Sequence, residues 1–480
     1  MSGQSPQAIR KLLKHPIVDC DGHWLESSAL IADYIRELAG PELAAKYLKT
    51  REMDAAPKWH SVSDEERLRL RYRRQVWWLF PAKAKEQATF RLPGLFYERM
   101  DEMGLDFSIM YPTLGLLLEG IRDDELRGAA IRAYNTMTAD LFRPYADRIT
   151  PVAVIPRRTP AEAVTELNHA VRNLGFKAVM ISGTIQRRTP GNERYIDTLG
   201  LDNAENYDPL WQACVDLKVA ATSHAGALSW GDHASVTNYC FNHIGHFAQG
   251  NAAFAKAVFL GGVTRRFPTL NFGFLEGGTA WARSLYCDLL GHYEKRSYEA
   301  AVKFLKPTDL DLGELRGYIG RYGLDRMKKL TDQIIAAIDG GERGTLKDQT
   351  ERERMHVDDF GASGVKSKKD LAAKFTSNFY FGCEADDPMT TVAFDRRLGL
   401  PLNAVFSSDI THWDVPDVLE VVPEAYEMVE HGMLTEDDFR HFAFANAVRL
   451  HGGMNPDFFK GTVVEAAAAA ELSSSTKVAA

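Results

Sequence analysis

The sequence predicts an α/β fold, a (β/α)₈ TIM barrel that carries two long, mainly helical insertions. Short apolar runs alternate with stretches of helical spacing along the chain, a pattern typical of parallel βα units. At least four of the apolar runs end in Asp, Glu or His, which in a parallel barrel places polar groups at the carboxyl ends of the strands. A chain of 480 residues is long enough for one large barrel with insertions.

Eight segments have the apolar, β-branched and aromatic composition of buried strands. The stretches between them suit helices: residues 161–175, AEAVTELNHAVRNLG, end at a glycine, and residues 207–218, YDPLWQACVDLK, place apolar side chains at helical spacing. In chain order, the predicted strands cover residues 16–20, 107–112, 149–156, 176–182, 219–225, 270–276, 379–384 and 403–409.

Two segments interrupt this alternation, at about residues 27–100 and 292–375. Both are too long for ordinary connections, so we expect helical lids over the barrel mouth or elements that mediate oligomerisation. The first contains the basic, aromatic stretch EERLRLRYRRQVWWLFP, which suits a packed amphipathic helix better than a nucleic-acid site. The predicted organisation is an N-terminal extension (1–15), the barrel with its insertions (16–460) and a flexible, alanine-rich tail (461–480).

Composition and charge exclude several classes of partner. The net charge of −8 gives no electrostatic footprint for nucleic acid or an anionic membrane. No apolar run approaches the ~20 residues that span a bilayer, and the N-terminus lacks the apolar region of a secretory signal. Five scattered cysteines suit free thiols in a reducing compartment, so we expect a cytoplasmic protein.

The first predicted strand leads into the segment IVDCDGHWLE, which carries Asp19, Asp21 and His23 at alternate positions. Residues two apart on a strand share a face, so all three side chains could point into the barrel mouth. Taken alone, the two aspartates are better explained as caps of the following turn. The later strand ends favour a shared site instead, because ATSHAG, FLEGG and FSSDITHWD supply further ionisable groups: His224, Glu276, Asp409 and His412.

Carboxylates and imidazoles without cysteine form the ligand set of an open catalytic site for Zn, Fe or Mn. The chain resembles the amidohydrolase superfamily, in the amidohydrolase-related branch that also contains ACMSD-like decarboxylases. The resemblance rests on DCDGH, RMDEMGLDFSIMYPT, SHAG, RRFPTLNFGFLEGG, SSDITHWD and LTEDDFRHFAFANAVRLHG, and it covers most of the barrel but neither long insertion.

The resemblance implies roles for individual residues. Asp21 and His23 stand at the two positions of the family's first-strand H-x-H pair, and His224 matches the ligand after the fifth strand. Asp409 matches the aspartate that binds metal and takes the proton from the attacking water. Glu276 stands where the family has a histidine. On this basis, we expect Asp409, His224 and His412 to act in catalysis.

The segment NYCFNHIGHFAQG adds His243 and His246, whose i, i+3 spacing would put both imidazoles on one face of a helix. Taken alone, the pair is better explained as structural. Together with Asp21, His23, His224, Glu276 and Asp409, it brings the candidate ligands to seven. An open site for one ion needs about three or four ligands. The larger number here predicts either that some of the seven residues orient the ligands or that the site holds two ions.

Four further residues adjoin the predicted site. Trp24 and Trp413 directly follow proposed site residues, so we expect them to form pocket walls. Asp19, deeper in the strand, is expected to orient the ligands, and Glu384, after the seventh strand, either to orient them or to cap its loop; neither is expected to bind metal.

The predicted function is metal-dependent hydrolysis, or decarboxylation, of a small organic substrate at a mono- or dinuclear centre. The alternative is a dinuclear Fe or Fe/Mn monooxygenase, because Asp21 and Glu276 replace histidines and the pair His243 and His246 is added. A third hypothesis is a barrel that lends only structure and has no activity. The long insertions also favour a homo-oligomer or a complex with a related chain.

Overall fold

The computed structural model describes residues 3–53, 59, 61–74, 83–224, 235–304, 309–340 and 358–478. The chain forms two compact units, one made of residues 1–285 and 373–480, the other of residues 286–372. Among the described residues, no helix combines the length and the apolar character needed to cross a membrane.

The larger unit is built around an eight-stranded parallel sheet whose strands follow one another in chain order. The backbone N–H of His23 donates to the Ile410 carbonyl and that of Asp409 to the Asp21 carbonyl, each at 3.1 Å, which joins the last strand to the first. The predicted (β/α)₈ barrel is therefore confirmed, and each predicted strand segment overlaps an observed strand: β1 Val18–Trp24, β2 Phe107–Pro112, β3 Ile149–Val154, β4 Ala178–Met180, β7 Ala221–Ser223, β8 Phe272–Phe274, β9 Phe379–Glu384 and β10 Asn403–Ser407.

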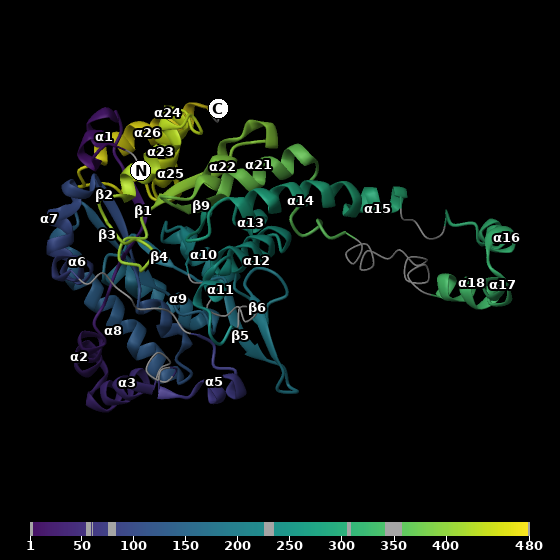
Figure 1. Cartoon of the computed structure of the whole chain (residues 1–480), viewed down its shortest axis with the longest axis horizontal. Coiled ribbons are helices and arrows are strands. Elements are labelled where there is room, and N and C mark those ends of the chain that lie inside the picture. Colours follow the sequence, from purple (N-terminus) through teal and green to yellow (C-terminus); the bar gives the residue numbers. More distant parts are fainter. Residues whose placement is uncertain are drawn as a thin grey trace. The chain divides into compact units, whose positions relative to one another are not determined.

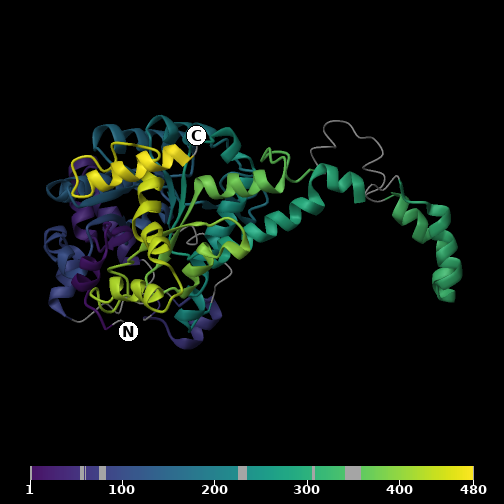
Figure 2. The same cartoon turned by 90° about the horizontal axis from the view of Figure 1, so that it is seen from above.

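Helices of this unit surround the strands in both views (Figures 1 and 2). Local signals begin several of them: the Asp123 carboxylate caps the helix that starts at Asp124, and the Thr159 hydroxyl caps the helix that starts at Pro160. The helices after the strands include η1 Gly115–Gly120, α8 Asp124–Phe142, α9 Pro160–Asn168, α10 Asp208–Asp216, α11 Tyr239–His243, α12 His246–Leu260, α13 Val263–Arg266, α22 Thr391–Phe394, α23 Val421–Glu430, α24 Glu436–Arg440 and α25 Asn446–Gly452, and α14 Ala280–Arg296 begins in this unit and continues into the smaller one.

The first predicted insertion is mainly helical where it is described, and its helix α2 packs on α3 and on α8. The packed amphipathic helix expected in the basic aromatic stretch is wrong for its described part, because α5 ends at Leu70, buries no residue and is followed by Arg71 in a left-handed conformation (φ 54°). Trp77 and Trp78, in the same stretch, lie outside the described residues. A role as lid or oligomerisation element stays a prediction. The N-terminal helices are α1 Pro6–Leu12, α2 Ser28–Ala39, α3 Pro41–Met53, α5 Asp64–Leu70, α6 Ala84–Arg91 and α7 Pro93–Met103.

The smaller unit falls within the second predicted insertion and is also helical. Ion pairs link Arg296 to Asp359 at 2.9 Å and Arg316 to Asp332 at 2.7 Å, and the Tyr293 ring lies edge-on to Phe360. Its helices are α15 Tyr298–Phe304, α16 Leu312–Tyr322, α17 Asp325–Lys329 and α18 Thr331–Gly340, and α21 Lys368–Asn378 leads out of it.

The first strand contains a β-bulge between Asp19 and Gly22. Asp19 pairs with Ser108 and His23 with Tyr111, and these partners are three residues apart on β2, so Asp19 and His23 lie on opposite faces. The expectation that Asp19, Asp21 and His23 share one face is therefore wrong for Asp19. Gly22 is required here, because a Cβ would clash with the carboxylate of Asp19 and the hydroxyl of Ser108.

Two further elements differ from the sequence prediction. Strands β5 (Thr184–Arg188) and β6 (Arg194–Thr198) form an antiparallel hairpin that was not expected. The tail expected to be flexible instead forms α26 (Glu465–Val478), which packs on α25. Its residue Glu471 is buried and pairs with Arg440 at 2.8 Å and Arg449 at 2.6 Å, which anchors the tail helix.

Candidate metal centre

The inner face of β1 presents Asp21 and His23, and both side chains are fully buried. The Nδ1 atom of His23 lies 2.9 Å from the Pro112 carbonyl oxygen at the end of β2. Because a carbonyl only accepts, Nδ1 carries the proton and Nε2 presents a lone pair to the barrel interior. Burial, together with the nearby imidazoles of His412 and His224, holds the pKa of His23 well below its usual value. His23 is thus prepared as a neutral nitrogen ligand.

His224 follows β7 and completes a first group of ligand atoms. Its Nε2 atom lies 3.0 Å from Nε2 of His23 and 3.7 Å from an Asp21 oxygen, and that oxygen lies 3.5 Å from Nε2 of His23. These three atoms approach one another within 4.8 Å, close enough to hold one ion.

The loop after β10 supplies a second group, made of Asp409, His412 and again His23. The Nδ1 atom of His412 lies 2.6 Å from Asp409 Oδ1, which in turn lies 3.5 Å from Nε2 of His23. The rings of His412 and His23 are stacked with 4.0 Å between their centroids. Burial alone would lower the pKa of His412, but Asp409 and Glu276 outweigh it and hold that pKa well above its usual value.

Glu276 follows β8 and connects the two groups. One of its oxygens lies 2.9 Å from Nε2 of His224 and the other 3.6 Å from Nδ1 of His412. Burial opposes ionisation of Glu276, but the two imidazoles more than compensate and keep its pKa well below the usual range. Glu276 is therefore an anion placed between two histidines.

The residues present fit a divalent cation. Within the described part of the chain, neither carboxylate oxygen of Asp21 accepts a hydrogen bond, although both are buried. Buried polar atoms without partners are costly, and a cation would supply the missing interaction. Burial raises the pKa of Asp21 to about 8, which a neighbouring positive charge would reverse. The nitrogen and oxygen donors suit Zn, Fe or Mn.

Backbone strain is concentrated at the same place. Glu276 (φ 52°), Asp409 (φ 47°) and Thr411 (φ 90°) adopt positive φ values that residues other than glycine rarely take. Such conformations cost about 1–3 kcal/mol each and persist where the surrounding structure imposes them. Here they turn the carboxylates of Glu276 and Asp409 toward the histidines.

Comparison with known proteins gives the family. A family model described as amidohydrolase matches residues 18–308, more than half of the chain. The chain belongs to the amidohydrolase family. This confirms the resemblance inferred from the sequence motifs, and the protein is an enzyme of the hydrolase or lyase type. A search of curated proteins found no match.

Solved structures similar to this chain include one amidohydrolase and two decarboxylases. An amidohydrolase from Mycobacterium avium subsp. paratuberculosis K-10 is 17% identical, with a TM-score of 0.50 over 92% of this chain and 100% of that chain. A 2,6-dihydroxybenzoate decarboxylase from Rhizobium is 16% identical (TM-score 0.47; 91% and 98% covered). A 5-carboxyvanillate decarboxylase from Novosphingobium aromaticivorans DSM 12444, solved with manganese, is 14% identical (TM-score 0.48; 91% and 96% covered).

His243 and His246 do not share a helix face as expected. Helix α11 ends at His243, Gly245 takes a left-handed conformation (φ 76°), and α12 begins at His246. The nearest carboxylate oxygen paired with His243 belongs to Asp414, at 4.0 Å, and the His243 side chain is 24% exposed. Among the described residues, the close groups of ligand atoms contain neither histidine.

Trp24, Trp413 and Glu384 were also predicted to lie beside the site. Trp24 lies opposite His23 on β1 and packs edge-on against Phe142 of α8, so it belongs to the layer outside the barrel and is not a pocket wall. Trp413 contacts the rings of Tyr239 and His243. Burial, together with the charge of Glu276, raises the pKa of Glu384 to about 8, so this carboxyl lies near the site without belonging to either ligand group.

Asp19 has a supporting role in the geometry. Its carboxylate accepts hydrogen bonds from the Ser108 hydroxyl at 2.7 Å, from the Ser408 N–H and hydroxyl at 3.0 and 2.9 Å, and from the Asp21 N–H at 3.2 Å. It thereby fixes β1 against β2 and against the loop that carries Asp409. Asp414, which closes the segment SSDITHWD two residues after His412, was not among the predicted site residues, and its carboxylate lies 4.0 Å from Nε2 of His243.

Proposed function

We propose that this amidohydrolase holds one divalent metal ion through Asp21, His23, His224 and Asp409, and hydrolyses or decarboxylates a small organic substrate. The observation that carries the proposal is the pair of buried ligand groups that meet at His23. Because Nδ1 of His23 is committed to the Pro112 carbonyl, only its Nε2 atom can bind a metal. Two groups that share one donor atom favour one ion over two.

A bound divalent ion would supply Lewis-acid chemistry and lower the pKa of water to about 7. The chain's own residues then handle the proton. Asp409 and His412, 2.6 Å apart, form a buried pair that can accept a proton from water at Asp409 and pass it on through the His412 imidazole. Glu276 keeps His412 and His224 oriented toward the centre.

Hydrolysis and decarboxylation place different demands on this pair. In hydrolysis, Asp409 takes a proton from water and His412 returns it to the leaving group. In decarboxylation, the carbon that loses carbon dioxide must receive a proton. His412 is the proposed donor, because the nearby carboxylates of Asp409 and Glu276 keep its imidazole protonated. Both reactions are therefore within reach of the same residues.

The oxygenase hypothesis requires a second ion, and it stays a prediction without further support. Its proposed extra ligands, His243 and His246, lie outside both close groups among the described residues. Homo-oligomerisation or pairing with a related chain likewise stays a prediction.

The experiment combines metal analysis with turnover. The purified full chain should contain about one Zn, Mn or Fe ion, and it should release carbon dioxide from hydroxybenzoates or hydrolyse small amides, esters or lactones. His412→Gln should lower turnover at least a hundredfold while metal content persists, and His243→Ala should leave both nearly unchanged. Turnover that stops without oxygen, or two ions per chain, would overturn the proposal.

A further inference from the structure

A cavity of about 700 Å³ lies at the carboxyl ends of β2, β3 and β4, within the barrel unit. Its volume is within the range of about 300–1,000 Å³ typical of small-ligand sites. None of the proposed metal ligands lines it. The residues around it include one carboxylate, Glu119, and six arginines: Arg122, Arg157, Arg158, Arg187, Arg188 and Arg194. In a chain with net charge −8, this is a local concentration of positive charge.

Two of these arginines are anchored by acids and form the frame of the cavity. Arg157 is buried, pairs with Glu119 at 3.0 Å and donates from Nε to the Thr184 carbonyl at 2.9 Å. Arg187 pairs with Asp197 at 2.5 Å and donates to the Tyr207 hydroxyl at 2.9 Å. Their positions are therefore fixed before any ligand arrives.

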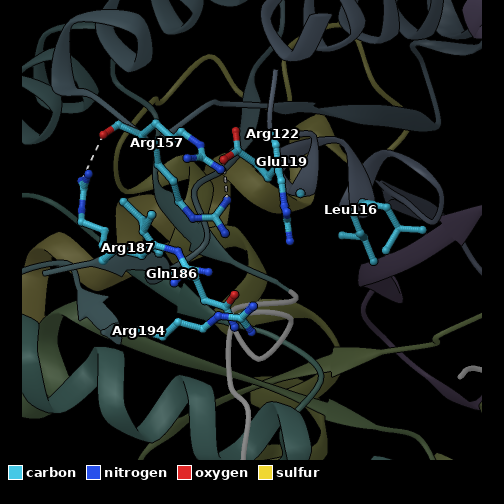
Figure 3. A pocket seen from close by; sticks show the side chains of 12 residues that line it. Leu116, Glu119, Arg122, Arg157, Gln186, Arg187 and Arg194 are labelled. Carbon is cyan, nitrogen blue, oxygen red and sulfur yellow. Dashed lines mark hydrogen bonds and ion pairs between the residues drawn. The ribbon is translucent and has the colours of Figure 1, made fainter. Parts of the chain in front are cut away.

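Three other arginines have no acid of their own. Arg122, Arg158 and Arg194 make no side-chain hydrogen bond or ion pair with the described residues, and the Nε atom of Arg158 is buried. Figure 3 shows Arg122 and Arg194 pointing from different sides toward the same space, with the Arg157 guanidinium beside it. Like charges that face one another unpaired are stabilised by an anion between them.

We propose that this cavity binds a small anion with two or more negative charges, carried by phosphate or carboxylate groups. Arginine suits this role because its planar guanidinium binds either group through two parallel hydrogen bonds. The walls come from three different βα loops, so one ligand would join the segments after β2, β3 and β4. The proposal does not depend on the reaction at the metal centre.

The test measures binding of two probes, inorganic pyrophosphate and citrate, to the full chain by calorimetry and thermal shift at constant ionic strength. We expect saturable binding that persists with a chelator present, which separates this site from the metal centre. Stronger binding of pyrophosphate assigns a phosphate ligand, and stronger binding of citrate assigns a carboxylate ligand.

Matched variants locate the site. Arg122→Gln/Arg194→Gln should raise the dissociation constant at least tenfold, and the pair Arg122→Lys/Arg194→Lys should raise it less than the glutamine pair does, because lysine keeps the charge but loses the two parallel hydrogen bonds. The control Arg172→Gln/Arg265→Gln changes two exposed arginines outside the cavity and should have no effect. The proposal would be overturned if neither probe showed saturable binding beyond that of chloride, or if the control variant lost as much affinity as the Arg122→Gln/Arg194→Gln variant. Binding of an acidic peptide but of neither probe would also overturn it.

Discussion

The Nε2 atoms of His23 and His224 face each other at 3.0 Å inside the barrel, although the two residues are 201 positions apart in the sequence. His23 cannot donate from this nitrogen, because its proton is held at Nδ1 by Pro112. Burial lowers the pKa of His224, but Asp21 and Glu276 more than compensate and raise it. His224 can therefore carry the proton that lies between its Nε2 atom and that of His23. A metal cation bound between these two nitrogen atoms would replace that proton.

The first prediction concerns metal content. His23→Ala should reduce bound metal from about one ion per chain to less than a tenth, because both ligand groups lose their common donor. Inductively coupled plasma mass spectrometry of the purified chain measures this. His243→Ala serves as the control and should keep the ion. Loss of metal in that control, or about two ions in the parent protein, would restore the dinuclear hypothesis.

The second prediction concerns Asp19. Asp19→Ala should lower the free energy of unfolding by about 3 kcal/mol, because the buried donors of Ser108, Ser408 and Asp21 lose their acceptor. Urea denaturation measures this effect, and Ser108→Ala, which removes a single bond, should cost about 1 kcal/mol. If Asp19→Ala lost metal without losing stability, Asp19 would be a ligand and not a support.

The third prediction concerns pH. His451 is fully buried, and burial lowers its pKa to about 3. Below about pH 6.5, the unfolded chain therefore binds a proton at His451, whereas the folded chain does not. The contribution of His451 to the free energy of unfolding is fully present above that pH and decreases as the pH falls. Between pH 7 and 5, the parent protein should lose about 2 kcal/mol more than His451→Phe does. Parallel pH dependences in the two proteins would show that His451 is not the cause.

The fourth prediction concerns the C-terminal helix. Glu471→Ala should destabilise the protein by about 1–2 kcal/mol, because a buried carboxylate between Arg440 and Arg449 is lost while both partners are partly exposed. Ser473→Ala, on the exposed side of α26, is the control and should change the free energy of unfolding little. If chemical denaturation gave the two variants the same free energy of unfolding, the ion pairs of Glu471 with Arg440 and Arg449 would not stabilise the protein.

The barrel could be predicted because its signals are local. Each strand is a short apolar run bounded by polar residues, and β2 and β9 begin and end where the sequence indicated. The proximity of Asp21, His23, His224, Glu276 and Asp409 could be predicted for the same reason, since the carboxyl ends of the strands in a parallel barrel all open on one side.

The rest depends on contacts that one strand does not reveal. The bulge in β1 is set by pairing with β2, and it alone decides that Asp19 leaves the inner face. The break between His243 and His246 follows from one left-handed residue, Gly245, which the helical spacing concealed. The arginine cavity did leave a signal: the tetrapeptide RRTP occurs at 157–160 and again at 187–190, and both copies contribute to its walls.

The bulge in β1 also limits how this enzyme can be redesigned. The five residues from Asp19 to His23 lie opposite only the four residues from Ser108 to Tyr111, so the bulge holds one residue more than the partner strand. A β1 strand of the same sequence that paired residue for residue with β2 would place Asp19 on the same face as Asp21 and His23. A redesign of the residues in this strand must therefore keep the bulge, because the bulge holds the carboxylate of Asp19 away from the buried histidines.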